Sequence, residues 1–260
     1  MSRIFTADAR DTPPKWTLQL FNSALAFGVL ALLFSFAFYQ LNYHWNWASV
    51  YKYRQKFLGG WWNTILISLT ALVCSTAIGT CFALAQRARF LPLRYFSKLY
   101  VELIRGTPLL VQILIFFYVV ADAFRVSNRY VVGVLTLSFF SGAYITEIIR
   151  AGIESIGQSQ LESARAIGFT TRQTYRYVVF PQALRNILPP LAGQFVSLIK
   201  DSSLLSIIAI QEFTLNAREV SSYTFSALES YLPLAAGYLL LTLPISIWTR
   251  ALEKKHRFET

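Results

Sequence analysis

Six stretches of the chain are almost continuously apolar, and each is about as long as a lipid bilayer is thick. A helix needs roughly 20 mostly apolar residues to cross about 30 Å of hydrocarbon at 1.5 Å per residue. Because backbone groups find no water partner in lipid, helices are the expected structure for such stretches. The predicted spans are Leu20–Leu41, Trp61–Ala85, Leu99–Ala121, Tyr130–Ile149, Ile187–Ile210 and Tyr231–Thr249.

Two of these spans are interrupted. Gly106 and Pro108 predict a local kink in the third span, where freed carbonyls would bind water or solute. The prolines Pro189 and Pro190 and a pair of adjacent charges break the pattern of the fifth. The spans divide the chain into an N-terminal part, residues 1–60, a core, residues 61–250, and a C-terminal tail, residues 251–260.

The composition agrees with lipid as the main solvent of this chain. Only 14% of its residues are charged, against about 25% in an average soluble domain, and 55% are hydrophobic. The two cysteines, Cys74 and Cys81, lie seven residues apart in one apolar stretch. They are interpreted as small residues packed within a membrane helix, and no metal site or disulfide is expected.

The formal net charge of +11 is explained by topology and does not indicate nucleic-acid binding. Aromatic residues lie inside or beside the apolar stretches, as in the interfacial belts of membrane proteins. If the N-terminus is cytoplasmic, sixteen basic residues fall in cytoplasmic segments and six in outer loops. The positive-inside rule therefore predicts that both termini are cytoplasmic.

The polar segment between the fourth and fifth spans, residues 150–186, carries a spaced motif. Glu162-Ser163-Ala164 is followed after three residues by Gly168 and, nine residues later, by Val178-Val179-Phe180-Pro181. Residues 160–167 are expected to form a short helix, and Gly168 allows a sharp reversal with positive φ. A second helix would end at Pro181, which lacks an N–H group. This pattern predicts a rigid knob.

The motif resembles the signature loop of importer-type ATP-binding-cassette (ABC) permeases, which reads Glu-Ala-Ala, three residues, Gly, nine residues, Ile, any residue, Leu-Pro. Ser163, Val178 and Phe180 are conservative departures from it. The resemblance extends from about Trp61 to Arg250 and narrows to polar-amino-acid permeases of the histidine, glutamine and arginine uptake type. The segments that carry this narrower resemblance are Glu102–Gln112, Ser141–Ile153, Pro181–Arg185 and Ser197–Leu205.

The resemblance implies an all-α membrane protein with six transmembrane helices, a five-helix type I ABC importer permease core plus one N-terminal helix. Such a subunit translocates a polar amino acid across the bacterial inner membrane. Its expected partners are an ABC nucleotide-binding subunit that binds ATP and Mg, a second permease subunit (the same chain or a paralogue) and a periplasmic or extracellular solute-binding protein. The residues implied to form the ATPase-coupling loop are Glu162, Ser163, Ala164, Gly168 and Pro181.

The chain is not expected to hydrolyse ATP or to bind a cofactor itself. Residues 152–159 have the glycine spacing of a phosphate-binding loop, but Gln158 stands where that loop needs a lysine. The preceding residues also end a membrane helix and not a buried strand. No catalytic residue is therefore predicted, and energy would come from a separate ATPase or from an ion gradient.

The charged pair inside the fifth span, Lys200 and Asp201, is a candidate for the solute passage. An ionisable group at mid-bilayer costs at least ~3 kcal/mol, so it usually marks a pathway or a partner. With Ser202, and with Thr107 and Gln112 of the third span, the pair is expected to line a polar passage. A structural interhelical pair is one alternative. An ion-coupled secondary transporter that uses Lys200 and Asp201 as relay groups is another.

Further charges are predicted to have structural roles. Glu102 and Arg105, and likewise Glu147 and Arg150, are three residues apart and are expected to form ion pairs on their helices. The outer segment 211–230 is interpreted as a docking surface for the solute-binding protein or as a solvated loop. Its charged residues include Glu212, Arg218, Glu219 and Glu229.

Overall fold

The computed structural model describes residues 16–40 and 43–256. These fall into two compact units, and the boundary lies between residues 45 and 46. The first unit contains helix α1 (Trp16–Tyr39), which is long and apolar enough to cross a membrane. Its most apolar stretch has no buried residue, as expected for a helix surrounded by lipid. The predicted end of this span, Leu41, lies outside the described residues.

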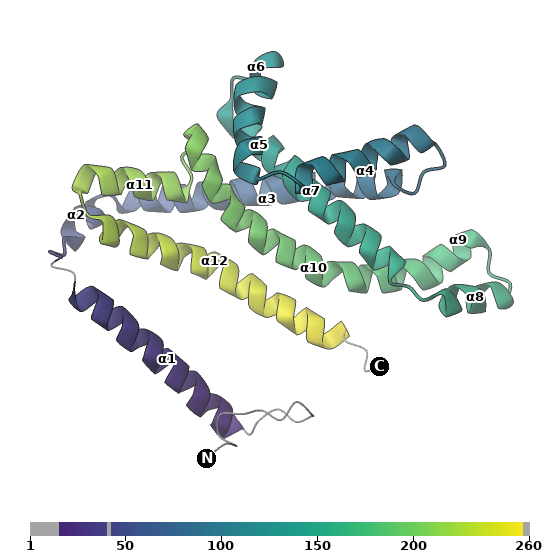
Figure 1. The fold of residues 1–260 in the computed structure, drawn as a ribbon, viewed down its shortest axis with the longest axis horizontal. Helices are drawn as coiled ribbons and strands as arrows, with labels where there is room; N and C mark the ends of the chain where they lie inside the picture. Colours follow the sequence, from purple (N-terminus) through teal and green to yellow (C-terminus); the bar gives the residue numbers. More distant parts are fainter. Residues whose placement is uncertain (1–15, 41–42, 257–260) are drawn as a thin grey trace. The chain divides into compact units, whose positions relative to one another are not determined.

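The second unit is a bundle of four long helices that run roughly alongside one another (Figure 1). Short helices gather at its two ends. Helices α8 (Gln158–Ala166) and α9 (Thr171–Thr174) lie at one end, called the knob end below, and α2 (Trp47–Lys52) and α11 (Phe213–Thr224) lie at the opposite end. The described part of the unit contains no strand. The long helices are α3 (Arg54–Ala85), α7 (Arg129–Glu154), α10 (Phe180–Asp201) and α12 (Ala227–His256).

Small residues allow α3 and α7 to pack backbone against backbone. A Cβ atom added to Gly79 of α3 would lie 2.6 Å from the Ile145 side chain and 2.9 Å from the Gly142 carbonyl oxygen of α7. The Thr146 hydroxyl is 2.8 Å from the Gly142 carbonyl and 3.2 Å from the Gly79 carbonyl, so it bridges the two helices. In lipid, such close approach is a main source of helix association.

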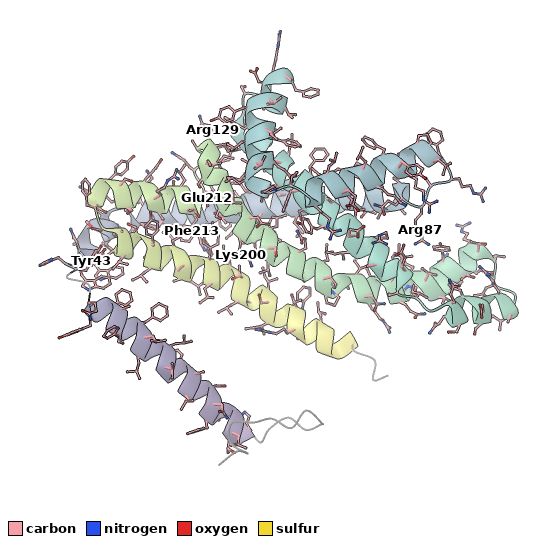
Figure 2. The ribbon with its side chains drawn as sticks, in the orientation of Figure 1. Tyr43, Arg87, Arg129, Lys200, Glu212 and Phe213 are labelled. Atoms are coloured by element: carbon pink, nitrogen blue, oxygen red, sulfur yellow. The ribbon has the colours of Figure 1, made fainter. Side chains whose placement is uncertain are left out.

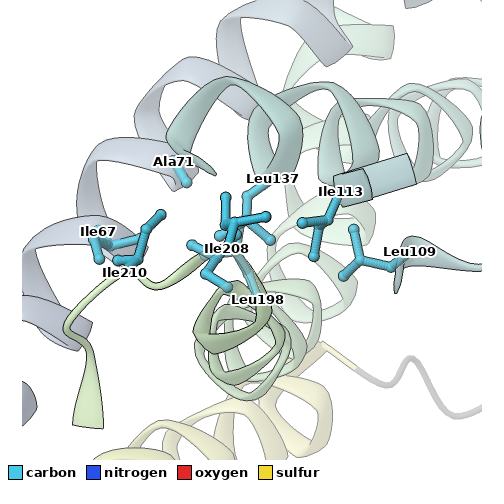
Figure 3. Close-up of a cluster of buried hydrophobic side chains, with 9 residues drawn as sticks. Ile67, Ala71, Leu109, Ile113, Leu137, Leu198, Ile208 and Ile210 are labelled. Atoms are coloured by element: carbon cyan, nitrogen blue, oxygen red, sulfur yellow. The ribbon is translucent and has the colours of Figure 1, made fainter. Parts of the chain in front are cut away.

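An apolar cluster forms where α3, α7 and α10 meet two further elements, α5 (Leu109–Ile115) and the 3-10 helix η4 (Ser202–Ile208) (Figure 3). Each of its members is at most 6% exposed. The cysteines do not contribute to the interior, because Cys74 and Cys81 are exposed, contrary to the expected packing. The nine residues of this core cluster are Ile67, Ala71, Leu109, Ile113, Leu137, Leu198, Leu205, Ile208 and Ile210.

The third predicted span is broken where a kink was expected. It starts earlier than Leu99, as helix α4 (Leu91–Arg105), and then turns by 109° into α5, a π-helical turn η2 (Phe116–Val120) and α6 (Ala121–Ala123). The chain cannot continue as one helix because Pro108 lacks an N–H and its ring restricts the preceding residue. The described residues therefore contain five candidate spans, or six if this bent pair is counted as one.

Prolines inside the other spans do not interrupt them. Helix α10 continues through Pro189 and Pro190, and α12 through Pro233 and Pro244. The prolines that interrupt the apolar pattern of the fifth span therefore do not break its helix. The irregularity comes later, where α10 tightens into η4 and ends at Ala209 in the left-handed conformation, with φ of 57°.

Two segments outside the predicted spans, at the opposite end of the bundle, contain helices. Residues 47–52 form α2 (Trp47–Lys52), α3 starts seven residues before the predicted Trp61, and α11 (Phe213–Thr224) lies within the predicted loop 211–230. Residues 46–60 consequently belong to the bundle unit. At the other terminus, α12 extends into the predicted tail as far as His256.

Helix α11 is held in place by the buried carboxylate of Glu212. This carboxylate accepts hydrogen bonds from the backbone N–H groups of Leu215 (2.7 Å) and Thr214 (2.8 Å) and from the Tyr238 hydroxyl (3.0 Å). Glu229 is also fully buried. The prediction that these two acids lie on a solvated surface is therefore wrong. The prediction of a solvated position fits Glu219 better, because this side chain is partly exposed and forms an ion pair with Lys56.

The close contact at Gly79 predicts opposite effects of one substitution at two helical glycines. Gly79→Ala should destabilise the protein by ~1–3 kcal/mol because the added methyl group meets α7. Gly193→Ala in α10, where nothing lies within 4 Å, should stabilise it by ~0.5–1 kcal/mol because alanine is the better helix former. Thermal unfolding of both variants in one detergent measures the difference. Equal changes in the unfolding temperature of the two variants would contradict the close packing of α3 against α7 at Gly79.

The cap of α11 predicts a large and pH-dependent loss of stability in Glu212→Ala. The variant should lose ~2–3 kcal/mol because three donors lose their acceptor, whereas Glu219→Ala, which removes a partly exposed ion pair, should lose under ~1 kcal/mol.

Burial raises the pKa of Glu212, although its hydrogen bonds partly offset this effect. Stability due to a raised pKa is present below the unfolded-state value, about 4.3, and is lost as the pH rises through the folded-state value. The difference in unfolding temperature between the wild type and Glu212→Ala should therefore become smaller with increasing pH. A difference that grows with pH would contradict the burial effect.

Candidate functional site

The predicted knob is present at one end of the bundle. Helix α8 (Gln158–Ala166) carries Glu162 and Ser163 on its exposed side and Ala164 on its buried side. Gly168 follows with φ of +84°, the left-handed conformation that reverses the chain. The turn is closed by two backbone hydrogen bonds, from Gly168 to Arg165 (2.9 Å) and from Phe169 to Ala164 (3.0 Å). Both the helix and the glycine turn are confirmed.

The return arm of the knob differs from the prediction. Helix α9 (Thr171–Thr174) begins with a capping box between Thr170 and Gln173 and leads into a π-helical turn, η3 (Tyr175–Val179). Helix α10 then continues through Pro181 and does not end there. The wider turn explains this, because the Phe180 N–H bonds to the Tyr175 carbonyl five residues back. Pro181, which has no N–H, comes immediately after this change of register.

Apolar and polar contacts fix the knob to the bundle. Ile156, Val179 and Ala183 form a buried cluster that includes residues of α10 and of the segment before α8. The Gln182 amide donates to Gln160 of α8 and the Asn186 amide donates to Ser155, each at 2.8 Å. The knob is therefore packed against the ends of α7 and α10 and is not a detached loop.

A cavity of about 660 Å³ lies between α4, α7 and the end of α3. Helix α4 contributes charges at every fourth position, and α7 contributes charges from its last two turns. The cavity therefore contains both cations and carboxylates. The residues that line it are Gln86, Arg87, Arg94, Lys98, Val101, Glu102, Glu147, Arg150 and Glu154.

One ion pair joins α4 to α7, and two more lie within α7. The predicted pair of Glu147 and Arg150 is confirmed, with a distance of 2.8 Å between Oε2 and Nη2. The predicted pair of Glu102 and Arg105 is wrong, because Arg105 reaches across to Glu147, at 3.3 Å. Arg150 also pairs with Glu154, at 2.7 Å. A carboxylate on the neighbouring helix was closer to Arg105 than the one on its own helix.

The cavity was not predicted, although the sequence contains a signal for it. Arg94, Lys98 and Glu102 are spaced by four, which places them on one face of a helix. The predicted third span began at Leu99 and so excluded two of these residues from its helix.

The predicted passage residues Thr107 and Gln112 lie at the break between α4 and α5. The Gln112 amide nitrogen donates to the carbonyl oxygens of Ile104 (2.7 Å) and Thr107 (3.1 Å) and lies 2.8 Å from the Thr107 hydroxyl. It thus satisfies carbonyls that the break releases. Its amide oxygen is buried without a hydrogen-bond partner in the described part of the chain.

The other predicted passage residues lie at the end of α10. Lys200 is exposed, Asp201 is half-buried, and the buried Ser202 donates to the Ile199 carbonyl at 2.7 Å. Figure 2 shows Lys200 along α10, away from Arg87 of the charged cavity. The core cluster contains Leu109 and Ile113 beside Gln112 and Leu198 beside Lys200. The two predicted groups therefore flank the same apolar cluster, and a passage between them stays a prediction.

Helices of membrane length, a rigid knob at one end and a charged cavity beside it define a polytopic membrane transport subunit. The chain matches the family described as "binding-protein-dependent transport system inner membrane component" over residues 75–258. This match covers more than half of its length, so the chain belongs to that family. The resemblance to ABC importer permeases is thereby confirmed.

Three relatives are similar in sequence to this chain over most of their length. The probable glutamine ABC transporter permease of Bacillus subtilis strain 168 is 36% identical over 76% of this chain and 92% of its own. The glutamine transport system permease of Escherichia coli K12 is 33% identical over 81% and 97%. The L-cystine transport system permease of Bacillus subtilis strain 168 is 36% identical over 76% and 85%.

Solved structures of ABC transporters also resemble this chain. A chain of an amino acid ABC transporter crystallised with histidines superposes with a TM-score of 0.76 and 34% identity, covering 82% of this chain and all of that chain. An inward-facing methionine ABC transporter gives 0.63 at 13% identity, over 79% of this chain and 98% of that one, which supports the fold alone.

Proposed function

We propose that this chain is the permease subunit of an ATP-driven importer for a polar amino acid and that a separate nucleotide-binding subunit hydrolyses the ATP. The knob is the observation that carries the proposal. It presents Glu162 and Ser163 to a partner while Ala164 is buried on its inner side. The spacing of the knob motif is that of the loop on which the ATPase of such importers docks.

The attachment of the knob favours mechanical coupling. Closure of the ATPase around ATP would displace α8, and the cluster of Ile156, Val179 and Ala183 would pass this displacement to α10. Gly168 keeps the turn sharp, so the knob would move as a body and would not flex. Rocking of the long helices would then open the solute passage alternately to each side of the membrane.

The charged cavity favours a zwitterionic solute. An amino acid carries a carboxylate and an ammonium group. Guanidinium groups bind a carboxylate with two parallel hydrogen bonds, and carboxylates accept hydrogen bonds from an ammonium group. Cations and carboxylates both line this cavity. The printed names of the relatives, which include glutamine and cystine permeases, agree with this class of solute.

The assembly would contain a second permease subunit, either the same chain or a paralogue. The greater number of basic residues in the segments that include the knob favours a cytoplasmic position for the knob and for both termini. The opposite end of the bundle, with α11, would then face the solute-binding protein. The subunit would reside in the bacterial inner membrane.

ATP dependence separates this proposal from an ion-coupled secondary transporter. Membrane vesicles that contain the complex and its binding protein should accumulate radiolabelled L-glutamine, L-cystine or L-histidine only when ATP is supplied on the knob side. A sugar serves as the control solute. Uptake driven by a proton or sodium gradient without ATP, and lost in Lys200→Met, would support the secondary transporter instead.

The knob turn predicts uncoupling in Gly168→Val. A β-branched residue at φ of +84° is strained by ~1–3 kcal/mol, so the knob should distort while the membrane helices still form. Uptake per ATP hydrolysed should fall roughly tenfold. Gly157→Ala is the matched control. Gly157 has φ of −61°, which alanine also adopts, and a Cβ atom added there would lie 3.6 Å from its nearest neighbour, the Ser159 hydroxyl. Normal uptake by Gly168→Val would contradict the role of the knob.

A further inference from the structure

Helix α4 presents two adjoining stripes of exposed residues, one charged and one apolar. Each stripe has one residue at every fourth position, the spacing at which residues share one face of a helix. The charged stripe consists of Arg94, Lys98 and Glu102, which line the charged cavity, and the apolar stripe consists of Tyr95, Leu99 and Leu103. The members of the apolar stripe are 66%, 57% and 58% exposed. The two stripes adjoin at Lys98, whose Nζ atom lies 6.0 Å from the centre of the Tyr95 ring.

Contacts with α3 set the level of α4 relative to the bilayer. The Ser97 hydroxyl donates to the Phe82 carbonyl at 2.8 Å, and the Phe82 ring stacks on Tyr100 with 4.1 Å between the ring centroids. Phe82 lies in the last turn of α3, whose apolar stretch ends at Ala85. Helix α4 therefore begins where α3 leaves the hydrocarbon and runs back into it beside α3 (Figure 1).

Three cations of the charged cavity have no carboxylate partner. Among residues 16–40 and 43–256, no carboxylate lies within 4 Å of Arg87, Arg94 or Lys98. The carboxylates that α7 contributes to the cavity are already paired with arginines. Glu102 is the one carboxylate of the lining that is left against these three cations. The excess of positive charge, beside an exposed apolar stripe, suits an anion that has an apolar tail.

We propose that the start of α4 binds one anionic phospholipid, with the headgroup phosphate against Arg94 and Lys98 and the acyl chains along Leu99 and Leu103. The order of these residues matches that of the lipid, because the cations come first at the bilayer edge and the leucines lie deeper. Guanidinium and ammonium groups hold phosphate oxygens with charge-assisted hydrogen bonds, and basic pockets between membrane helices bind lipid headgroups in this way. The inference goes beyond the proposed function and does not depend on which solute the chain carries.

The apolar stripe distinguishes a phospholipid from free phosphate as the ligand. Free phosphate would neutralise the cations but would leave the apolar stripe uncovered. Acyl chains would cover it, and each methylene group that they bury adds to the affinity. Tyr95, at the level of the headgroups, has the amphipathic ring that is typical of the aromatic belt at this depth.

The test uses the complex purified with its ATPase through a tag on this chain and washed with detergent until its lipid is removed. Phosphatidylglycerol is then titrated back, and native mass spectrometry counts the lipid molecules that stay bound. The wild type should retain one phosphatidylglycerol more tightly than it retains zwitterionic phosphatidylcholine. Added salt should weaken this preference, because the attraction of exposed charges is screened.

Removal of the two cations should weaken binding of the lipid strongly. Arg94→Gln combined with Lys98→Gln should lower the affinity for phosphatidylglycerol roughly 25-fold, since each cation near a membrane surface is worth about fivefold. The exchange of Arg94→Lys with Lys98→Arg keeps both charges and should keep the affinity.

Arg172→Gln combined with Arg176→Gln is the matched control. These two arginines are also exposed, four residues apart and at the knob end, beside the exposed ring of Phe180. In the described part of the chain neither has a carboxylate within 4 Å. This variant loses the same charge but should retain phosphatidylglycerol as the wild type does. Equal losses in the two glutamine pairs would show attraction to surface charge in general and would overturn the site on α4.

Inorganic phosphate, titrated over the same concentrations, separates a lipid site from a phosphate site. Phosphatidylglycerol should raise the unfolding temperature of the lipid-free complex, because a ligand that binds the folded state stabilises it, and inorganic phosphate should not. Equal protection by inorganic phosphate would overturn the assignment to a lipid. Failure of the wild type to retain phosphatidylglycerol, as expected if a second permease subunit covers this face of α4, would also overturn it. None of these measurements involves solute uptake, so ATP-driven import is tested separately.

Discussion

Each break in a helix of this bundle exposes backbone groups that the hydrocarbon of a bilayer cannot satisfy. At three such places the structure supplies a side chain or a turn. Gln112 donates to the carbonyls released between α4 and α5, and Glu212 accepts from the first N–H groups of α11. At the knob, the bond from Phe169 to Ala164 closes the turn after α8. The positions at which the bundle can bend are consequently few.

The same constraint applies at the knob. Its return arm begins with a capping box, and α8, which has no side-chain cap, ends in the hydrogen-bonded turn at Gly168. The inner side of the knob is joined to α7 and α10, and Gly152 brings these helices so close that an added Cβ would lie 2.4 Å from Ile187. The knob is therefore joined to the bundle by packed backbone as well as by side chains.

Much of the fold was predictable because lipid leaves so few choices. Apolar length located the spans, and motif spacing located the knob with its reversal at Gly168. The errors arose where tertiary contacts outweighed local pattern. Pro181 was expected to end a helix, but a π-helical turn accommodates it, and Arg105 found its carboxylate on α7. Glu212 was assigned to a loop because a buried cap of a short helix has no periodic signal.

The π-helical turn gives the spacing between Gly168 and Pro181 a geometric meaning. Successive residues of an α-helix are separated by about 100° around its axis, so the extra residue in η3 sets the rotational angle at which α9 leaves α10. Removing one residue there would swing Glu162 to another side of the bundle, although each arm kept its fold. The number of residues in this segment therefore fixes the direction in which the knob points. In related chains that contain the knob, we expect this segment to tolerate substitutions more readily than insertions or deletions.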